Sequence, residues 1–278
     1  MSNNLNDKVI IVTGAASGFG KLVSEKAAAL GAKIVASDVN KTALDTLIAN
    51  LQAAGHAAVG VEADASNRQQ MNQVAQTAIS EFGRIDVMLN NAGIMPLAFY
   101  SDHHQAADAW DKCIDVNFRG VLNGITAVHD QMIKQGTGHV VNMSSIYGNT
   151  PVAGAAVYGA TKAAVNFLSE SLRTESQGKI KVTTIRPTGV PGTALADGIV
   201  NPEALAGILG ASYEGYMQKF MSMMSGELPE TFTDSENIEY FALDPEFVAD
   251  QILYAINQPW GVSVSDLTVR ASGESYVI

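Results

Sequence analysis

The chain has 278 residues, of which 47% are hydrophobic and 16% charged, and its formal net charge is −11. This length and composition allow one large α/β domain with an extensive buried core. The acidic balance, without any cluster of basic residues, argues against a nucleic-acid partner and against an anionic membrane surface. No stretch approaches the roughly 20 apolar residues that a membrane-spanning helix needs.

The amino-terminal stretch and the cysteine content bear on the location of the protein. The stretch "MSNNLNDK" (1–8) has neither the basic start nor the apolar run of a secretion signal. The one cysteine, Cys113, cannot form an internal disulfide and is expected to be a small buried hydrophobic residue. We therefore expect a cytoplasmic protein in a reducing compartment.

Short apolar runs rich in β-branched residues alternate with helical patterns along the chain. The first two helical patterns, 21–30 and 41–54, each end at a glycine, Gly31 and Gly55, which is a common stop signal. The apolar runs are hydrophobic on both faces, as expected for a parallel sheet covered by helices on each side. They predict a doubly wound α/β fold of about seven strands. The predicted strands are 8–13, 33–37, 57–63, 86–91, 139–144, 181–187 and 262–269.

A long segment, 194–244, follows the sixth predicted strand and contains no clear strand of its own. This length is unusual for a connection and indicates a functional insertion. Within it, 213–224 ("YEGYMQKFMSMM") carries aromatic residues and methionines at helical spacing. This pattern fits either a helix packed on the core or a mobile cover over a pocket. The position directly after a strand favours the cover.

The stretch "TGAASGFG" (13–20) lies between the first predicted strand and the first helix. Its glycines, Gly14, Gly18 and Gly20, permit a tight turn and a close approach of a ligand to the backbone. The free N–H groups at the start of the following helix then face an anion such as a pyrophosphate. Asp38 lies 20 residues beyond Gly18 at the end of the second strand, the offset of a carboxylate that binds the adenosine ribose.

Asp38 also bears on the choice between NAD and NADP. A carboxylate at this position repels a 2′-phosphate, and the next residues, Val39 and Asn40, supply no cation to accept one. We therefore expect NAD as the cofactor. The alternative is that Asp38 is a turn residue or caps the helix that begins near Lys41.

Tyr158 and Lys162 stand four residues apart in "VYGATKAAV" (157–165), and therefore on one face of a helix. A phenol and an ammonium are then side by side. Taken alone, the pair fits an ordinary helix whose two amphipathic side chains extend to water.

Five motifs in order resemble those of the short-chain dehydrogenase/reductase family, over nearly the whole chain. The family's glycine loop matches 13–20, and its Asn-Asn-Ala-Gly motif matches 90–93. The stretch "DVNFRG" contains the family's helix asparagine as Asn117, and "NMSSIYG" contains its serine as Ser145. Tyr158 follows Ser145 by thirteen residues, the family interval, and begins the Tyr-x-x-x-Lys motif.

The resemblance implies a Rossmann-type fold in a single NAD(P)-binding domain, 1–278, with 194–244 as an inserted substrate-binding lid. It implies that Tyr158 is the general acid in carbonyl reduction and the base in alcohol oxidation. Lys162 would lower the pKa of the phenol and hold the nicotinamide ribose. Ser145 would bind the substrate oxygen, and Asn117 would hold a water that links the lysine to solvent.

The resemblance also implies a set of cofactor contacts. Asp64 in "EADAS" corresponds to the family residue that meets the adenine amino group; the alternative is that it only starts the following turn. The cofactor-binding residues are then Gly14, Ser17, Gly18, Phe19, Gly20, Asp38, Asp64, Asn91, Ala92, Gly93, Tyr158, Lys162, Pro187, Val190 and Thr193.

The chain departs from the family in the loop after the sixth strand. Thr188 stands where the family has glycine after Pro187, and Thr193 comes six residues after that proline instead of five. One extra residue therefore shifts Val190 and Thr193 relative to the family's nicotinamide contacts. Arg119, where many relatives have an apolar residue, has no role that we can assign.

The chain also lacks the family's glycine-rich ending and has "SDLTVRASGESYVI" (265–278) in its place. This tail puts the family's usual tetramer interface in question. The resemblance still implies a homodimer or homotetramer through the helices that carry Asn117 and Tyr158.

Several neighbouring residues have other interpretations. Ser144, next to Ser145, fits a backbone cap at a strand end, and Asn90 fits a structural tie between strands. His103 and His104 are adjacent and do not converge as metal ligands do, so we expect no metal site.

The sequence therefore predicts a metal-free oxidoreductase, an alcohol dehydrogenase or carbonyl reductase, that transfers a hydride between NAD(H) and a secondary alcohol or its ketone. The alternatives are a catalytically silent NAD-binding redox sensor of the same fold, and a carbonyl reductase that prefers NADP. An epimerase or dehydratase with internally used NAD fits the glycine spacing less well.

Overall fold

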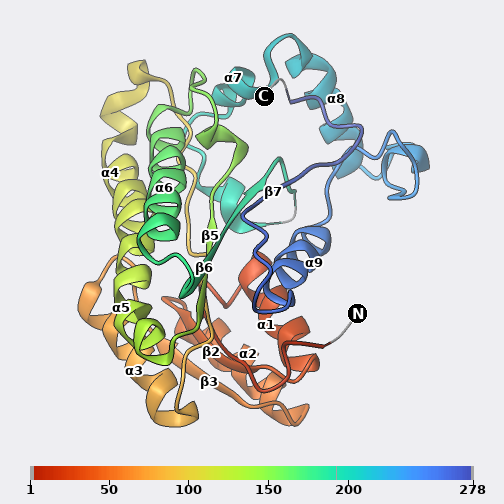
Figure 1. Ribbon diagram of the computed structural model, residues 1–278. Coiled ribbons are helices and arrows are strands. Elements are labelled where there is room, and N and C mark those ends of the chain that lie inside the picture. Colours follow the sequence, from red (N-terminus) through yellow and green to blue (C-terminus); the bar gives the residue numbers. More distant parts are fainter. Residues whose placement is uncertain (1–2, 192, 277–278) are drawn as a thin grey trace.

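The computed structural model describes residues 3–191 and 193–276. Seven parallel strands form one sheet in the order β3-β2-β1-β4-β5-β6-β7, which confirms the predicted doubly wound fold (Figure 1). The chain order reverses between β1 and β4, where such sheets bind ligands at the carboxyl ends of the strands. The strands are β1 (Val9–Thr13), β2 (Lys33–Asp38), β3 (Ala58–Glu62), β4 (Val87–Asn90), β5 (Gly138–Met143), β6 (Ile180–Pro187) and β7 (Asp266–Val269).

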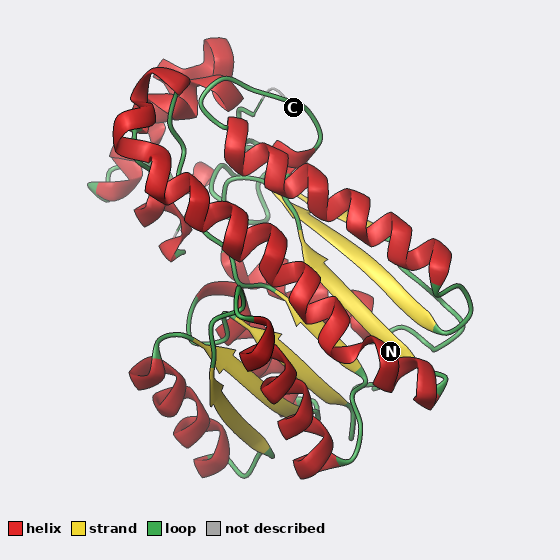
Figure 2. Cartoon of the chain, turned by 90° about the vertical axis from the view of Figure 1, so that its left-hand side faces the viewer, coloured by secondary structure: helices red, strands yellow, loops and turns green. Residues whose placement is uncertain are grey.

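Helices cover both faces of the sheet, as the apolar strands require (Figures 1 and 2). One face packs against α1 (Gly18–Ala29), α2 (Lys41–Ala53) and α9 (Pro245–Ile256). The other packs against α3 (Arg68–Phe82), α5 (Gly120–Gln135) and α6 (Ala156–Glu175), with α4 (His103–Cys113) beside α6.

Two elements begin three or more residues away from their predicted starts. Helix α1 begins at Gly18, three residues earlier than predicted. The prediction missed the first turn because it consists of glycine-loop residues, which have low helix propensity. Strand β7 begins at Asp266, because the preceding residues form an irregular segment. There the carbonyls of Val262 and Val264 accept hydrogen bonds from the Lys181 and Thr183 side chains.

The segment 194–244 contains short 3₁₀ turns, α7 (Ala206–Leu209) and α8 (Tyr213–Met224), and it forms no strand. Helix α8 has the predicted bounds, and none of its residues is fully buried. Figure 1 shows α7 and α8 beyond one end of the sheet. Helix α8 therefore lies at the surface, with Tyr213 and Tyr216 packed against a buried apolar cluster.

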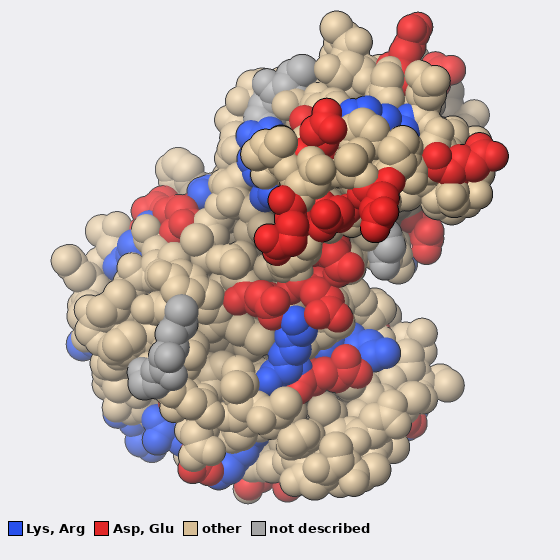
Figure 3. Space-filling model, turned by 90° about the vertical axis from the view of Figure 1, so that its right-hand side faces the viewer, with Lys and Arg blue, Asp and Glu red and all other residues tan. Residues whose placement is uncertain are grey.

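The surface carries both signs of charge. Figure 3 shows many Asp and Glu side chains on the face that includes α9, around a hollow, with Lys and Arg side chains between them. Among the described residues, no helix has the length and hydropathy required to cross a bilayer.

His139 is a buried, neutral histidine in β5. Its Nε2 donates to Thr183 Oγ1 at 2.8 Å, because that hydroxyl donates to the Val264 carbonyl at 2.6 Å. Its Nδ1 therefore carries no proton, and it has no hydrogen-bond partner among the described residues. Burial, with smaller effects from Lys181 and Lys8, lowers the pKa of His139 to about 3.

We expect His139 to make the protein less stable as the pH falls. Its folded-state pKa lies below its ordinary value of 6.5, so between the two values the unfolded chain binds a proton that the folded chain excludes. This contribution is complete above pH ~6.5 and decreases by up to about 2 kcal/mol by pH ~5. Urea unfolding at several pH values across this range gives the free energy of unfolding as a function of pH. The slope of this plot should be smaller for His139→Gln than for the wild type. Equal slopes would contradict the assignment.

Candidate active site

The glycine loop connects β1 to α1. It lies at the end of β1, next to the point between β1 and β4 where the strand order reverses. Gly14 and Gly18 have φ angles of 62° and 49°, which favour glycine. A Cβ on Gly20 would overlap the carbonyl oxygen of Gly14, so the helix can approach the loop only with glycine there. Ser17 caps α1 without a side-chain hydrogen bond. The first N–H groups of the helix are therefore left for an anion, with Phe19 half-buried beside them.

Asp38 connects the end of β2 to the glycine loop. Its Oδ2 accepts a hydrogen bond from the Ala16 N–H at 2.9 Å, and its Oδ1 accepts one from the Asn40 N–H at 2.8 Å. The cap of α2 is Asn40, whose side chain accepts from the Ala43 N–H. Asp38 therefore does not cap the helix, although it does form a local turn.

A hollow of about 280 Å³ lies beside Asp38, at the carboxyl ends of β2 and β3. Asp64 lines it, with a carboxylate oxygen that accepts from the Ser66 N–H and hydroxyl at 2.8 Å. Glu62 also lines it and pairs with Asp38 in the sheet register. Among the described residues, no lysine or arginine lines the hollow, and the nearby Lys41 forms an ion pair with Asp45.

The Asn-Asn-Ala-Gly stretch is held against the glycine loop. Asn91 Nδ2 donates to the carbonyls of Thr13 and Gly14 at 2.9 and 3.0 Å. The Thr13 hydroxyl accepts from the backbone N–H groups of Asn91 and Ala92. Asn90 donates to Asn142 across β4 and β5 at 2.8 Å, which confirms the predicted structural tie.

Tyr158 and Lys162 are both buried on one face of α6, with 3% and 5% of their surfaces exposed. The Lys162 ammonium lies 5.7 Å from the centre of the Tyr158 ring and donates to the Met143 carbonyl at 2.8 Å. A Cβ on Gly93 would lie 3.6 Å from that ammonium. Neither side chain extends to water as on an ordinary surface helix.

Burial shifts the pKa values of Tyr158 and Lys162 in the directions that favour their uncharged forms. It raises the pKa of Tyr158, while a hydrogen bond with Ser145 lowers it. Burial lowers the pKa of Lys162 to about 8. In this arrangement the ammonium donates to the Met143 carbonyl, and the lowering of the phenol pKa by the lysine stays a prediction.

The two serines after β5 face different partners. Ser144 Oγ donates to the Lys162 carbonyl at 3.1 Å. Ser145 Oγ accepts from the Tyr147 N–H at 3.3 Å and is the serine that interacts with the Tyr158 phenol. Ser145 therefore lies at the candidate site, and Ser144 ties the strand end to α6.

Asn117 lies in a π-helical turn (Ile114–Arg119) between α4 and α5, and it is completely buried. Its side chain forms two hydrogen bonds of 2.9 Å with the backbone of Ile94, and its Nδ2 is 3.3 Å from Thr161 Oγ1. Such local π-turns are common at functional sites. In the same turn, Arg119 forms an exposed ion pair with Asp115 at 3.1 Å, which explains its presence without a role in the site.

Cys113 is buried beside Asn117 and Thr161, as predicted. Burial raises the pKa of its thiol to about 11, so it stays protonated at neutral pH.

The loop after β6 reaches the glycine loop. The methyl side of Thr193 is 3.9 Å from the position of a Cβ on Gly18, and its hydroxyl donates to the Val190 carbonyl at 3.3 Å. Val190 packs against the core, and Pro187 ends β6 opposite Val269. The structure therefore brings both residues of the shifted loop to the same edge as the glycine loop.

Sequence reasoning missed several groups at this edge. The Met143 group that holds Lys162 is a backbone carbonyl, so no residue type in the sequence indicates it. Glu62 is placed opposite Asp38 by the register of β2 and β3, which the sequence does not reveal. Thr161 and Ile94, which hold Asn117, have no distinctive motif of their own.

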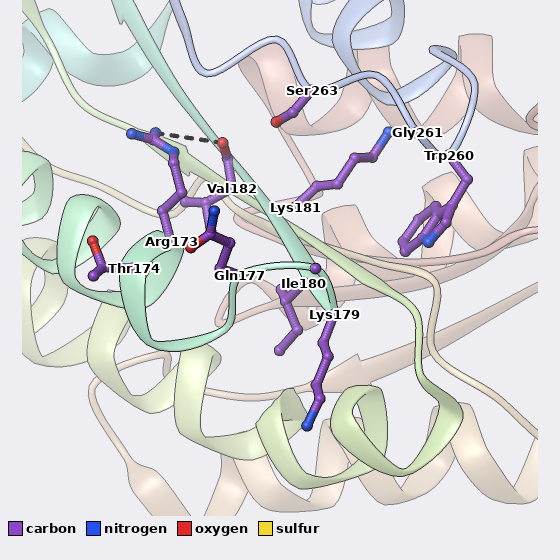
Figure 4. A pocket seen from close by; sticks show the side chains of 11 residues that line it. Arg173, Thr174, Gln177, Lys179, Ile180, Lys181, Val182, Trp260, Gly261 and Ser263 are labelled. Carbon is purple, nitrogen blue, oxygen red and sulfur yellow. Dashed lines mark hydrogen bonds between the residues drawn. The ribbon is translucent and has the colours of Figure 1, made fainter.

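A separate cavity of about 540 Å³ lies at the amino end of β6, the opposite edge of the sheet from Tyr158. Figure 4 shows Lys181 close to Trp260 there and Arg173 directed to the Val182 carbonyl. Lys181 donates to the Val262 carbonyl at 3.0 Å, so its ammonium has a partner within the protein.

Within the described part of the chain, no group of His, Cys, Asp and Glu is arranged to hold a metal ion. His103 and His104 lie at the exposed start of α4 with their rings 3.8 Å apart.

The comparisons with known proteins agree with this geometry. The family model for short chain dehydrogenases matches residues 8–204. The chain therefore belongs to the short-chain dehydrogenase/reductase family, and it is an oxidoreductase of that family.

Relatives extend the match along the whole chain. An uncharacterized oxidoreductase of Staphylococcus saprophyticus is 36% identical over 98% of this chain and 99% of its own length. One from Listeria monocytogenes is 33% identical with the same coverage.

Solved structures of similar shape contain nicotinamide cofactors. A short-chain dehydrogenase/reductase from Burkholderia phymatum in complex with NAD has a TM-score of 0.75 and 30% identity, over 96% of this chain and 90% of that one. A serine dehydrogenase complexed with NADP+ has a TM-score of 0.75 and 27% identity, over 94% of each chain.

The buried Lys162 gives a prediction about stability. Its folded-state pKa of about 8 lies below its ordinary value of 10.5, so the unfolded chain binds the proton more tightly between these values. This term makes the protein more stable as the pH rises through that range, by up to about 3 kcal/mol. Lys162→Met should therefore raise the free energy of unfolding at neutral pH. It should also remove the increase in stability between pH ~8 and ~10.5. Denaturant unfolding at pH ~7 and ~9.5 measures both effects, and a less stable variant would contradict them.

Proposed function

We propose that this protein is an NAD(H)-dependent oxidoreductase that interconverts a secondary alcohol and its ketone without a metal. The observation that carries the proposal is the buried pair of Tyr158 and Lys162 beside Ser145, at the sheet edge that also holds the glycine loop. The free N–H groups of α1 and the hollow beside Asp38 fit a dinucleotide. When bound, the dinucleotide supplies or accepts the hydride.

In this proposal, Tyr158 exchanges a proton with the substrate oxygen. Burial keeps its phenol protonated, so it is ready to donate during ketone reduction. In alcohol oxidation the phenol must lose its proton, and the ammonium of Lys162, on the same helix face, stabilises the resulting anion. With its pKa of about 8, Lys162 can also release and recover a proton near neutral pH.

Ser145 and Asn117 have supporting roles. The Ser145 hydroxyl already interacts with the Tyr158 phenol, so a substrate oxygen bound by one is within reach of the other. Asn117, locked to the backbone of Ile94, fixes the wall beside Gly93 and the lysine. We propose that it also positions the water that connects Lys162 with solvent.

The preference for NAD is argued from charge. Asp38 and Glu62 lie opposite each other in the register of β2 and β3, at the ends of these strands. Asp64 adds a third carboxylate beside the hollow. Carboxylates accept hydrogen bonds from ribose hydroxyls, and they repel a 2′-phosphate. The cation next in sequence, Lys41, is paired with Asp45.

Tyr158→Phe should reduce kcat by about 10²–10⁴-fold, because the variant cannot transfer the proton. The ring remains, so the affinity for NADH should change less than about twofold. Steady-state oxidation of a panel of secondary alcohols and NADH fluorescence titration measure the two effects. Tyr254→Phe, on the exposed side of α9, is the matched control and should behave as the wild type. Substantial residual turnover in Tyr158→Phe would refute the acid–base role.

Asp38→Ala should weaken NAD binding and reduce discrimination against NADP, because one carboxylate is removed from the ribose end. We expect the ratio of kcat/KM for NAD over NADP to fall at least about tenfold, the effect of roughly 1.4 kcal/mol. Glu81→Ala removes an exposed carboxylate of α3 as the control. An unchanged ratio would show that Asp38 does not select the cofactor.

A catalytically silent NAD-binding sensor, or a carbonyl reductase that prefers NADP, is the alternative. The intact set of Ser145, Tyr158 and Lys162 favours turnover over sensing. The same alcohol panel, assayed with both cofactors, separates the three possibilities.

We also propose that 194–244 is the substrate lid and that the protein forms a homodimer or homotetramer. The absence of buried residues in α8 supports the lid. Phe167, on the helix that carries Tyr158, is 78% exposed, and Ile114 is 41% exposed, which supports an interface on that side.

A further inference from the structure

Two features in which the chain departs from the family, Thr188 and the C-terminal tail, are joined by a hydrogen bond in this structure. The Thr188 hydroxyl, in the loop after β6, donates to the Glu274 carboxylate in the C-terminal tail. The Glu274 side chain is 5% exposed and also forms an ion pair with Arg270 Nε at 2.5 Å. The Thr188 N–H donates to the Val269 carbonyl at 3.2 Å. A side chain in place of the family's glycine therefore anchors the chain's own tail.

This anchor places Tyr276 on the loop. A Cβ on Gly189 would overlap the Tyr276 hydroxyl, so the tyrosine lies directly against the loop backbone. On its other side, the Gly273 N–H donates to the Tyr240 carbonyl at 2.8 Å. The tail is thus held by the loop after β6 and by the segment that follows α8.

Tyr276 also meets the lid. Its hydroxyl is 3.2 Å from that of Tyr216 in α8, with ring centres 5.7 Å apart. Tyr216 packs in turn against Phe241, at 5.0 Å between ring centres.

These tyrosines pack against the buried apolar cluster that contains Tyr158. The Tyr147 ring lies 5.5 Å from the Tyr158 ring, edge to face. Burial raises the pKa of Tyr147, Tyr216 and Tyr276, and neighbouring phenols raise the pKa of Tyr147 and Tyr276 further. At neutral pH the cluster therefore presents aromatic rings and uncharged hydroxyls.

We propose that Tyr276, paired with Tyr216, is a specificity-determining residue that contacts the body of the substrate, and that Glu274 is a positioning residue that holds it through Thr188. This inference rests on the proposed oxidoreductase function. The substrate class is an uncharged alcohol or ketone with an aryl or branched apolar body. The rings stack on such a body, whereas the phenols offer no cation to a carboxylate.

The test compares kcat/KM for 1-phenylethanol, 2-propanol and 3-hydroxybutyrate, together with the Kd for NADH. The wild type should prefer 1-phenylethanol over both others. Tyr276→Ala and Glu274→Ala should reduce the ratio of 1-phenylethanol to 2-propanol at least about fivefold through KM, with the Kd for NADH changed less than about twofold. Tyr276→Phe and Glu274→Gln should restore most of the ratio, because the ring and the acceptor for Thr188 remain. Tyr254→Phe is the control.

Three results would overturn the inference: an unchanged ratio in Tyr276→Ala, a parallel loss of NADH binding that marks the tail as merely structural, or a wild-type preference for 3-hydroxybutyrate. A wild type that oxidises no alcohol would instead overturn the proposed function. Binding of acetophenone to the NADH complex of Tyr158→Phe, measured by calorimetry, then tests the tail without turnover. Adding Tyr276→Ala should weaken this binding at least about fivefold, and equal affinities would refute the inference alone.

Discussion

The end of β5 organises the whole candidate site. Three consecutive residues there hold α6: the Met143 carbonyl accepts from the Lys162 ammonium, Ser144 bonds the Lys162 carbonyl, and Ser145 reaches the Tyr158 phenol. A buried ammonium requires a partner of this kind, because desolvation of an unpaired charge is costly. The position of the lysine, and with it that of the tyrosine one turn earlier, is therefore fixed by the sheet rather than by α6 alone.

Close packing between backbone segments makes this arrangement possible. A Cβ on Gly148 would lie 2.8 Å from the Lys162 backbone, and one on Gly159 would lie 2.9 Å from the Tyr147 carbonyl oxygen. The turn that carries Ser145 can approach α6 only because glycine stands on both sides. The same principle operates at Gly20, where α1 meets the glycine loop. Hydroxyl, phenol and ammonium converge because these contacts leave no room for side chains.

The sequence alone predicts those parts of the fold and site that depend on local pattern. Apolar runs and glycine stops located all seven strands and the first two helices, and the interval typical of the resembled family selected Ser145 over Ser144. Contacts between distant segments could not be predicted. The register that pairs Asp38 with Glu62, the carbonyl that holds Lys162 and the bond from Thr188 to Glu274 join residues far apart in the chain. Thr188 and the unusual tail were visible as separate departures, and only the fold shows that they compensate each other.

The order of the strands divides the carboxyl edge of the sheet electrostatically. The ends of β2 and β3 gather carboxylates, whereas β5 supports the ammonium of Lys162, and the glycine loop lies between them at the end of β1. A dinucleotide spanning this edge meets acceptors for its ribose hydroxyls at one end, backbone N–H groups in the middle and a cation at the other. The tyrosines beyond β6 add a neutral, aromatic region on the far side of that cation. In the proposed function, carboxylates lie where the ribose would be recognised, and the neutral tyrosine side chains lie where the substrate body would bind.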